Sequence, residues 1–230
     1  MEIPRDVCIT GGTGYIGRHL VPALVKRGHR VRVIARAGSI NHVPQGAVAV
    51  TADVLDESSL VSALRPGDTV VHLVGTPHPN PAKAAEFVRV DLASIGALVS
   101  AIRRVPIVHL VYVSVAQPAP IMRAYLEVRA EGERLIREAG VSATVLRPWY
   151  VLGPGHRWPA VLLPLYWIAE RIPRFQASAR RLGLVTLDQF VAALVTAVEE
   201  SPAPGSFSIV DVPRMREARH DSAEPRMTTA

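Results

Sequence analysis

Short apolar runs alternate with longer segments of helical periodicity along most of the chain. The apolar runs are rich in Val and Ile and predict strands at 7–9, 29–35, 47–51, 69–74, 107–114, 141–146 and 207–210. Between them, apolar positions recur at helical spacing and predict helices at 14–27, 57–64, 83–104 and 187–199, with a further helix through 125–129. Strands that alternate with helices are typical of βαβ units, so we expect an α/β fold with a parallel sheet.

A glycine-spaced turn follows the first predicted strand. The loop that we expect to bind phosphate contains Gly11, Thr13, Gly14, Tyr15, Ile16 and Gly17. The first glycine permits a tight turn, the second lets the backbone approach a pyrophosphate, and the third lets the helix pack against the strand. An ordinary strand-to-helix turn is the alternative, but the strand before the loop and the helix after it favour a nucleotide-binding opening. We therefore predict a Rossmann-type, doubly wound parallel sheet that binds a dinucleotide.

The end of the second predicted strand bears on the choice of cofactor. A site that prefers NAD has an Asp or Glu there to bind the ribose hydroxyls, whereas this chain has Ala35-Arg36-Ala37. A guanidinium can hold a 2′-phosphate bidentately, so Arg36 predicts that NADP (NADPH) is preferred over NAD. The alternative is a solvated arginine in an arginine-rich chain.

Further cofactor candidates stand at later strand ends. Asp53 and Val54 follow the third predicted strand, where a carboxylate could accept a hydrogen bond from the adenine amine, and a helix or turn cap is the alternative for Asp53. Gly75 follows the strand at 69–74 and would let the backbone pass close to the cofactor. His72 and His109 lie on core strands, so we expect satisfied core histidines there.

Composition limits the partners. The chain has 230 residues, 49% of them hydrophobic, which suits one α/β domain that we place at 1–212, and the polar segment 213–230 predicts a disordered tail. The net charge of +6 is spread along the chain, so we expect no nucleic-acid partner. We expect no signal peptide, no membrane span, no metal site and a cytoplasmic location for a monomer or homodimer, with Cys8 as a buried small hydrophobe.

A catalytic candidate follows the fifth predicted strand. Tyr125 and Arg129 stand four residues apart on a predicted helix, which puts the phenol and the cation on one face. The cation would favour the phenolate, and Ser114 at a strand end could hold a carbonyl oxygen of a small-molecule substrate. The alternative is a packing tyrosine with a surface arginine.

The segment 149–185 is expected to form a small substrate-side lid. It is rich in aromatic residues, and the candidates for the pocket lining are Trp149, Tyr150, His156, Arg157 and Trp158. A contact with a second subunit and plain core are the alternatives. The apolar run at 158–169 is too short to span a membrane but could contact a membrane surface or a quinone-like partner.

These motifs together resemble the atypical and extended short-chain dehydrogenase/reductase superfamily. The resemblance covers residues 6–211 and is carried by the glycine loop, Asp53, Tyr-Val-Ser114, Tyr125-xxx-Arg129, Leu146-Arg-Pro148 and Gly153-Pro-Gly155. It is most similar to a small NAD(P)H-binding branch related to an accessory subunit of respiratory complex I. The resemblance implies that Ser114 and Tyr125 are the catalytic pair and that Arg129 occupies the position of the family lysine.

Three departures from the family pattern bear on activity. The family lysine binds the nicotinamide ribose and feeds a proton relay, whereas Arg129 is effectively never deprotonated. Asp91 stands where active members often carry Asn, and Gly75 lacks the usual preceding Asn. We therefore consider an oxidoreductase acting on a small carbonyl or alcohol, a non-catalytic NADP sensor or assembly factor, and a sugar-nucleotide epimerase or dehydratase. The last class is expected to need a longer C-terminal domain.

Overall fold

The computed structural model describes residues 3–119, 121–154, 182–200 and 202–218. Seven parallel strands form one sheet in the order β3-β2-β1-β4-β5-β6-β9. Their bounds are β1 (Asp6–Thr10), β2 (Arg30–Ala35), β3 (Val48–Thr51), β4 (Thr69–His72), β5 (His109–Val113), β6 (Ala143–Leu146) and β9 (Phe207–Val210). The order reverses beside β1, as in doubly wound folds, so the predicted Rossmann-type parallel sheet is confirmed.

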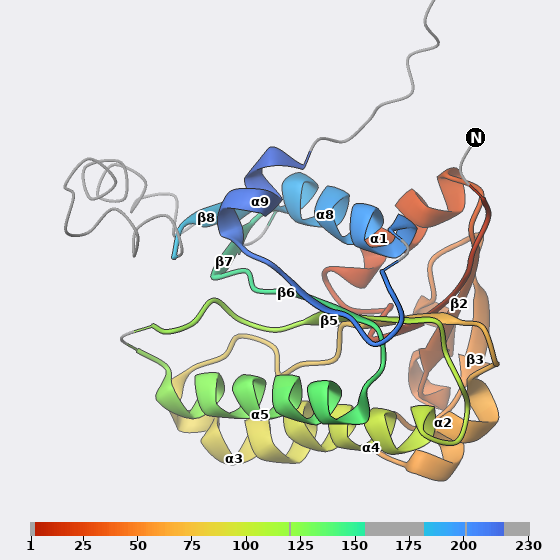
Figure 1. Ribbon diagram of the computed structural model, residues 1–230, viewed down its shortest axis with the longest axis horizontal. Coiled ribbons are helices and arrows are strands. Elements are labelled where there is room, and N and C mark those ends of the chain that lie inside the picture. The colour runs from red at the N-terminus through yellow and green to blue at the C-terminus, as the bar shows by residue number, and fades with distance from the viewer. Residues whose placement is uncertain (1–2, 120, 155–181, 201, 219–230) are drawn as a thin grey trace, which may run out of the picture.

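Helices cover both faces of the sheet (Figure 1). One face carries α1 (Gly17–Lys26), α8 (Leu187–Glu199) and α9 (Val212–Glu217). The other carries α2 (Glu57–Ala63), η2 (Pro81–Lys83), α3 (Ala84–Glu86), η3 (Phe87–Leu92), α4 (Ala93–Ile102) and α5 (Arg123–Ala139). A short 3₁₀ helix, η1 (Ala37–His42), follows β2. This arrangement leaves the carboxyl ends of the strands as one edge at which ligands can bind.

The core follows from the alternation of side chains along the strands. Ile9 and Val111 face the cluster formed with α1 and α8, whereas Cys8 and Leu110 face the cluster formed with α2, α4 and α5. Both faces are apolar, which is why the central strands read as continuous hydrophobic runs. Burial raises the pKa of the Cys8 thiol to about 12, in keeping with a buried small hydrophobe.

The helix predicted at 83–104 is not one regular α-helix. Its central part is the π-helical stretch η3, which carries the buried Asp91, and α4 continues from it. A π turn is not encoded by hydrophobic spacing, because the same apolar residues fit an α-helix. Such turns are often found at functional sites.

The C-terminal part contains two further differences from the predictions. A two-stranded parallel sheet, β7 (Tyr150–Leu152) with β8 (Leu184–Thr186), had no counterpart among the predicted strands. Helix α9 occupies residues 212–217, so the prediction of a disordered tail from 213 is wrong for its first five residues. Asp211 caps that helix, and Val212 and Met215 are buried in the core beside α8. Residues 219–230 lie outside the described part.

A capping box begins α8, the helix predicted at 187–199. The Thr186 hydroxyl oxygen accepts from the Gln189 backbone N–H at 3.2 Å, and Gln189 Oε1 accepts from the Thr186 N–H at 3.0 Å. Among the helices that the structure describes, none has the length and hydropathy needed to cross a bilayer.

Candidate nucleotide and catalytic site

The glycine loop after β1 is closely packed against its surroundings. Gly11 has a φ of +76°, and a Cβ there would lie 2.9 Å from the backbone carbon of Leu73. A Cβ on Gly17 would overlap the backbone of Gly12, so the first turn of α1 contacts the loop directly. These positions accept only glycine for steric reasons, as the motif predicts.

The N-terminus of α1 is open to an anion. No side chain caps it, and its first turn contains no acidic residue. The loop residues Tyr15 and Ile16 pack against the hydrophobic core, which fixes the start of the helix. A negative group would therefore meet the positive end of the helix dipole.

Arg36 and Asp53 follow the paired strands β2 and β3 at the same edge of the sheet. Arg36 is exposed, and its guanidinium makes no hydrogen bond or ion pair with any residue that the structure describes. Asp53 is also exposed, and its Oδ1 accepts from the Leu55 N–H at 2.9 Å, which is the geometry of a turn cap. Val54 packs against the core.

Gly75 lies directly against a side chain of the protein itself. A Cβ there would overlap Arg129 Nη2 and lie 3.3 Å from Asp91 Oδ1. The guanidinium thus fills the space beside Gly75. The structure therefore supplies a reason for this glycine other than the predicted approach of a cofactor.

Tyr125 and Arg129 lie together on α5, as the four-residue spacing predicts. Arg129 Cζ is 5.2 Å from the centroid of the Tyr125 ring, which is half-buried and packs against Phe87 with 5.0 Å between centroids. Arg129 is only 4% exposed, so it is not the surface arginine of the alternative interpretation.

The guanidinium of Arg129 is bound by groups of the protein. Arg129 Nη2 donates to Asp91 Oδ1 at 2.6 Å, and Nη1 donates to the Val113 carbonyl at 3.0 Å. Asp91 Oδ2 accepts from the N–H and the hydroxyl of Thr76 at 2.9 and 2.6 Å. Burial opposes the charge on Arg129, but Tyr125, Tyr112 and Asp91 raise its pKa, so the arginine stays protonated.

His72 and His109 are buried core residues, and His72 is satisfied as expected, whereas the Nδ1 of His109 has no hydrogen-bond partner among the described residues. The Nδ1 of His72 lies 2.8 Å from the Thr10 hydroxyl, and its Nε2 lies 3.2 Å from the Ser94 hydroxyl. Burial and the charge of Arg129 lower the pKa of His72 to about 3, so the ring is neutral. The Nε2 of His109 lies 2.9 Å from the Thr144 hydroxyl, and burial lowers its pKa to about 4.

Ser114 lies at the carboxyl end of β5, but its hydroxyl is bound to a residue that sequence reasoning missed. Ser114 Oγ donates to Glu133 Oε1 at 2.6 Å, and Glu133 also accepts from Gln117 and Arg147. Glu133 stands four residues after Arg129 on the buried face of α5. Its four-residue spacing from Arg129 places Glu133 on the same helical face as Tyr125 and Arg129, and this spacing could have identified it from the sequence.

Two of the five predicted pocket residues fall within the described part. Trp149 and Tyr150 are half-buried, and Tyr150 begins β7. Gly153, directly after β7, lies against the Tyr15 hydroxyl, which joins this segment to the glycine loop. His156, Arg157 and Trp158, and the apolar run at 158–169, lie outside the described residues.

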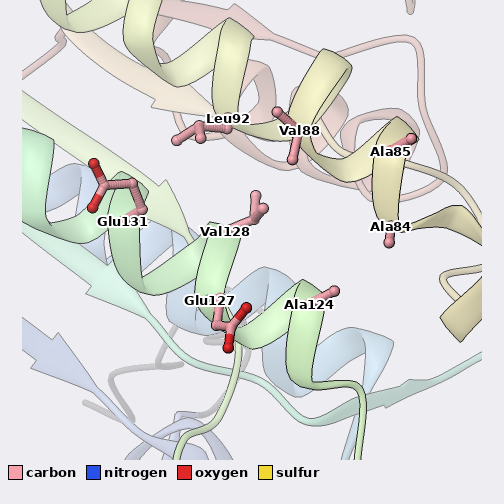
Figure 2. A pocket seen from close by; sticks show the side chains of 8 residues that line it. All are labelled: Ala84, Ala85, Val88, Leu92, Ala124, Glu127, Val128 and Glu131. Atoms are coloured by element: carbon pink, nitrogen blue, oxygen red, sulfur yellow. The ribbon is translucent and has the colours of Figure 1, made fainter.

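Two hollows are present elsewhere on the described surface. Figure 2 shows a groove of about 560 Å³ between α5 and the α3–η3 stretch, lined by small and apolar side chains with Glu127 and Glu131. A hollow of about 470 Å³ lies between α1, β7 and α8 and is lined by His19, Leu152, Gly153, Pro154, Thr186, Leu187 and Asp188. None of the predicted catalytic residues lines either hollow.

Comparison with known proteins agrees with this fold. Ceramide reductase of Caulobacter vibrioides (strain NA1000 / CB15N) is 29% identical over 96% of this chain and 72% of its own length. A Streptomyces 3-diazoavenalumate denitrifying reductase is 31% identical over 89% of this chain and 75% of its own. MoeE5, solved with UDP-glucose and NAD, superposes with a TM-score of 0.66 at 21% identity, over 91% of this chain and 79% of its own, and shows the fold. Residues 7–209 match the NAD dependent epimerase/dehydratase family, and the chain belongs to that family.

Proposed function

We propose that this protein is an NADP(H)-dependent oxidoreductase that acts on a small carbonyl compound or the corresponding alcohol. The observation that carries the proposal is the position of Tyr125. Its half-buried phenol stands in the first turn of α5 beside Arg129, which itself contacts the carbonyls of Val74 and Val113 just after β4 and at the end of β5. A proton donor at this edge of the sheet lies where ligands bind in doubly wound folds.

The cofactor would be held by residues that follow the first four strands, β1 to β4. The residues proposed for it are Gly11, Thr13, Gly14, Tyr15, Ile16 and Gly17 for the pyrophosphate, Arg36 for the 2′-phosphate, Asp53 and Val54 for the adenine, and Gly75. The uncapped N-terminus of α1 and the exposed guanidinium of Arg36 both suit phosphate. NADPH, when bound, supplies a hydride.

The protein's own part in the reaction is to orient the substrate and move a proton. Tyr125 would hold that proton at its hydroxyl oxygen, and Ser114 would contact the substrate oxygen. Arg129 would act by position and charge, not by proton relay, because it stays protonated and is paired with Asp91. Trp149, Tyr150, His156, Arg157 and Trp158 are proposed to line the substrate side.

The relatives favour this class of reaction. The two proteins named above are called reductases, and a Stigmatella aurantiaca relative, 27% identical over 73% of this chain, is called a ketoreductase. Their substrates differ from one another, so we propose the reaction class for this chain and no particular compound.

A non-catalytic NADP sensor or assembly factor is the second candidate. The observation that favours it is the buried Asp91–Arg129 ion pair, because the charge of Arg129 beside Tyr125 is already compensated by Asp91. An epimerase or dehydratase is the third candidate, because solved epimerases share the fold.

Removal of the Tyr125 hydroxyl distinguishes the first two candidates. We expect Tyr125→Phe to lower turnover of a carbonyl panel at least about a hundredfold while NADPH affinity stays within about twofold, because proton transfer is lost and binding is not. The assay follows NADPH consumption, with binding measured by fluorescence titration.

Tyr112→Phe is the matched control, since it removes a buried phenol that also contacts Arg129. We expect this variant to retain turnover. Equal activity of wild type and Tyr125→Phe would contradict the oxidoreductase assignment. A wild-type protein that binds NADPH and reduces nothing in the panel would support the sensor.

A further inference from the structure

Glu133 joins three segments of the chain at the carboxyl edge of the sheet. It lies on α5 about two turns after Tyr125 and is only 2% exposed. Its Oε1 accepts from Ser114 Oγ at 2.6 Å, from Gln117 Nε2 at 3.0 Å and from Arg147 Nε at 2.9 Å. Arg147 Nη2 donates to Oε2. A carboxylate that faces these donors accepts hydrogen bonds through both of its oxygens.

This carboxylate determines what the Ser114 hydroxyl can do. A serine hydroxyl has one proton to donate and two lone pairs with which to accept. The proton of Ser114 is committed to Glu133, and no residue in the described part of the chain donates to the Ser114 oxygen. The buried oxygen therefore keeps unused acceptor capacity at the end of β5.

We propose that Glu133 is a positioning residue that makes Ser114 a hydrogen-bond acceptor toward the substrate. A group that meets Ser114 must then bring its own proton, as a hydroxyl does and a carbonyl oxygen does not. Ser114 would bind the secondary alcohol of a redox pair in preference to the ketone. This inference rests on the proposed oxidoreductase function and names the form of the substrate that Ser114 recognises.

Glu133→Gln tests the direction of this hydrogen bond. In that variant the amide oxygen can still accept from Arg147 Nη2 at the place of Oε2, which puts the amide NH₂ at the place of Oε1, toward Ser114, and leaves Arg147 Nε without its acceptor. Ser114 then accepts from Gln and its proton becomes free for the ligand. The preference should invert, whereas a loss of packing alone would weaken both ligands equally.

The probes are 1-phenylethanol with the NADPH-loaded protein and acetophenone with the NADP⁺-loaded protein, two complexes in which no turnover occurs. By calorimetry, we expect Ser114→Ala to weaken the alcohol about tenfold and the ketone less than about twofold. We expect Glu133→Gln to weaken the alcohol and tighten the ketone, so that their affinity ratio shifts at least about tenfold. Ser94→Ala, which removes a fully buried hydroxyl that donates to the Asp91 carbonyl at 3.1 Å, is the control.

Neutron diffraction from deuterium-exchanged crystals locates the Ser114 proton without any substrate. A deuteron on the line from Ser114 Oγ to Glu133 Oε1 supports the proposal, and a deuteron that points away from Glu133 overturns it. Ser114→Ala that weakens the ketone as much as the alcohol also overturns it. If neither probe binds the wild type, the oxidoreductase assignment fails for these compounds, while the neutron map still decides the role of Glu133.

Discussion

The glycine loop with Arg36 differs from the polar face of α5 in the exposure and pairing of its charged groups. At the loop, α1 begins without a cap and Arg36 is exposed without a partner among the described residues. On α5, Arg129 and Glu133 are buried and paired with Asp91 and Arg147. The first region leaves its charge for a ligand, whereas the second uses its charge within the fold.

The difference follows from the cost of burial. An exposed guanidinium is solvated and can exchange water for phosphate, whereas a buried ion must be paired and hydrogen-bonded. Binding and catalysis can therefore be separate properties in this chain. The glycine loop predicts a bound cofactor. Activity depends on whether the buried ion pairs of α5 leave the hydroxyl groups of Tyr125 and Ser114 able to contact a substrate.

The largest effect is expected from breaking the buried ion pair between Asp91 and Arg129. Asp91→Ala removes the partner of Arg129 and should lower the free energy of unfolding by about 3–5 kcal/mol, because it leaves a buried charge uncompensated. Urea denaturation measures the loss. Glu127→Ala, which breaks the exposed pair with Arg123, is the control and should change stability by less than about 0.5 kcal/mol. An Asp91→Ala protein as stable as the wild type would show that Asp91 does not compensate the buried charge of Arg129.

A methyl group in the glycine loop should affect both stability and binding. Gly17→Ala brings a Cβ into the backbone of Gly12 and is expected to cost about 2–3 kcal/mol, with cofactor affinity reduced more than about tenfold. Thermal unfolding and fluorescence titration measure the two effects. Gly96→Ala, in open space on α4, is the control and should raise stability by about 0.5–1 kcal/mol. Unchanged binding by Gly17→Ala would remove the loop from the proposed site.

Acid should lower the stability of the folded protein through the buried His72. The pKa of His72 is lowered from 6.5 to about 3 by burial and by Arg129, so the unfolded chain binds a proton that the native state excludes. Stability is therefore full above pH 6.5 and falls as the pH drops toward 3. Between pH 7 and 5 the loss from this residue is about 2 kcal/mol. His72→Gln should lose correspondingly less in urea titrations at both pH values, and an equal loss would contradict the assignment.

The smallest expected effect concerns cofactor choice. Arg36→Ala removes the proposed contact to the 2′-phosphate and should weaken NADPH about tenfold, while NADH stays within about twofold. Arg104→Ala, which removes an exposed arginine 3.6 Å from Glu57, is the control. A parallel loss for both nucleotides would assign Arg36 to general electrostatics.

The sequence predicts the sheet well because its strands are buried on both faces and read as apolar runs. The tight packing of Gly11 and Gly17 and the proximity of Tyr125 to Arg129 also follow from spacing. What spacing does not reveal is long-range pairing. The Asp91–Arg129 pair joins residues 38 positions apart, and the π turn that carries Asp91 has no hydrophobic signature.

The same limit applies to Ser114 and Arg36. A strand-end serine was predicted to meet a substrate, but its partner Glu133 lies 19 residues away on another element. The exposure of Arg36 is expected for a charged residue at a strand end. Only the structure shows that its guanidinium has no partner among the described residues.

Binding of NADP(H) through the glycine loop and Arg36 is tested by parallel fluorescence titrations of the wild-type protein with NADPH and NADH. We expect NADPH to bind at least about tenfold more tightly, the equivalent of about 1.4 kcal/mol. Equal affinities, or tighter binding of NADH, would contradict it.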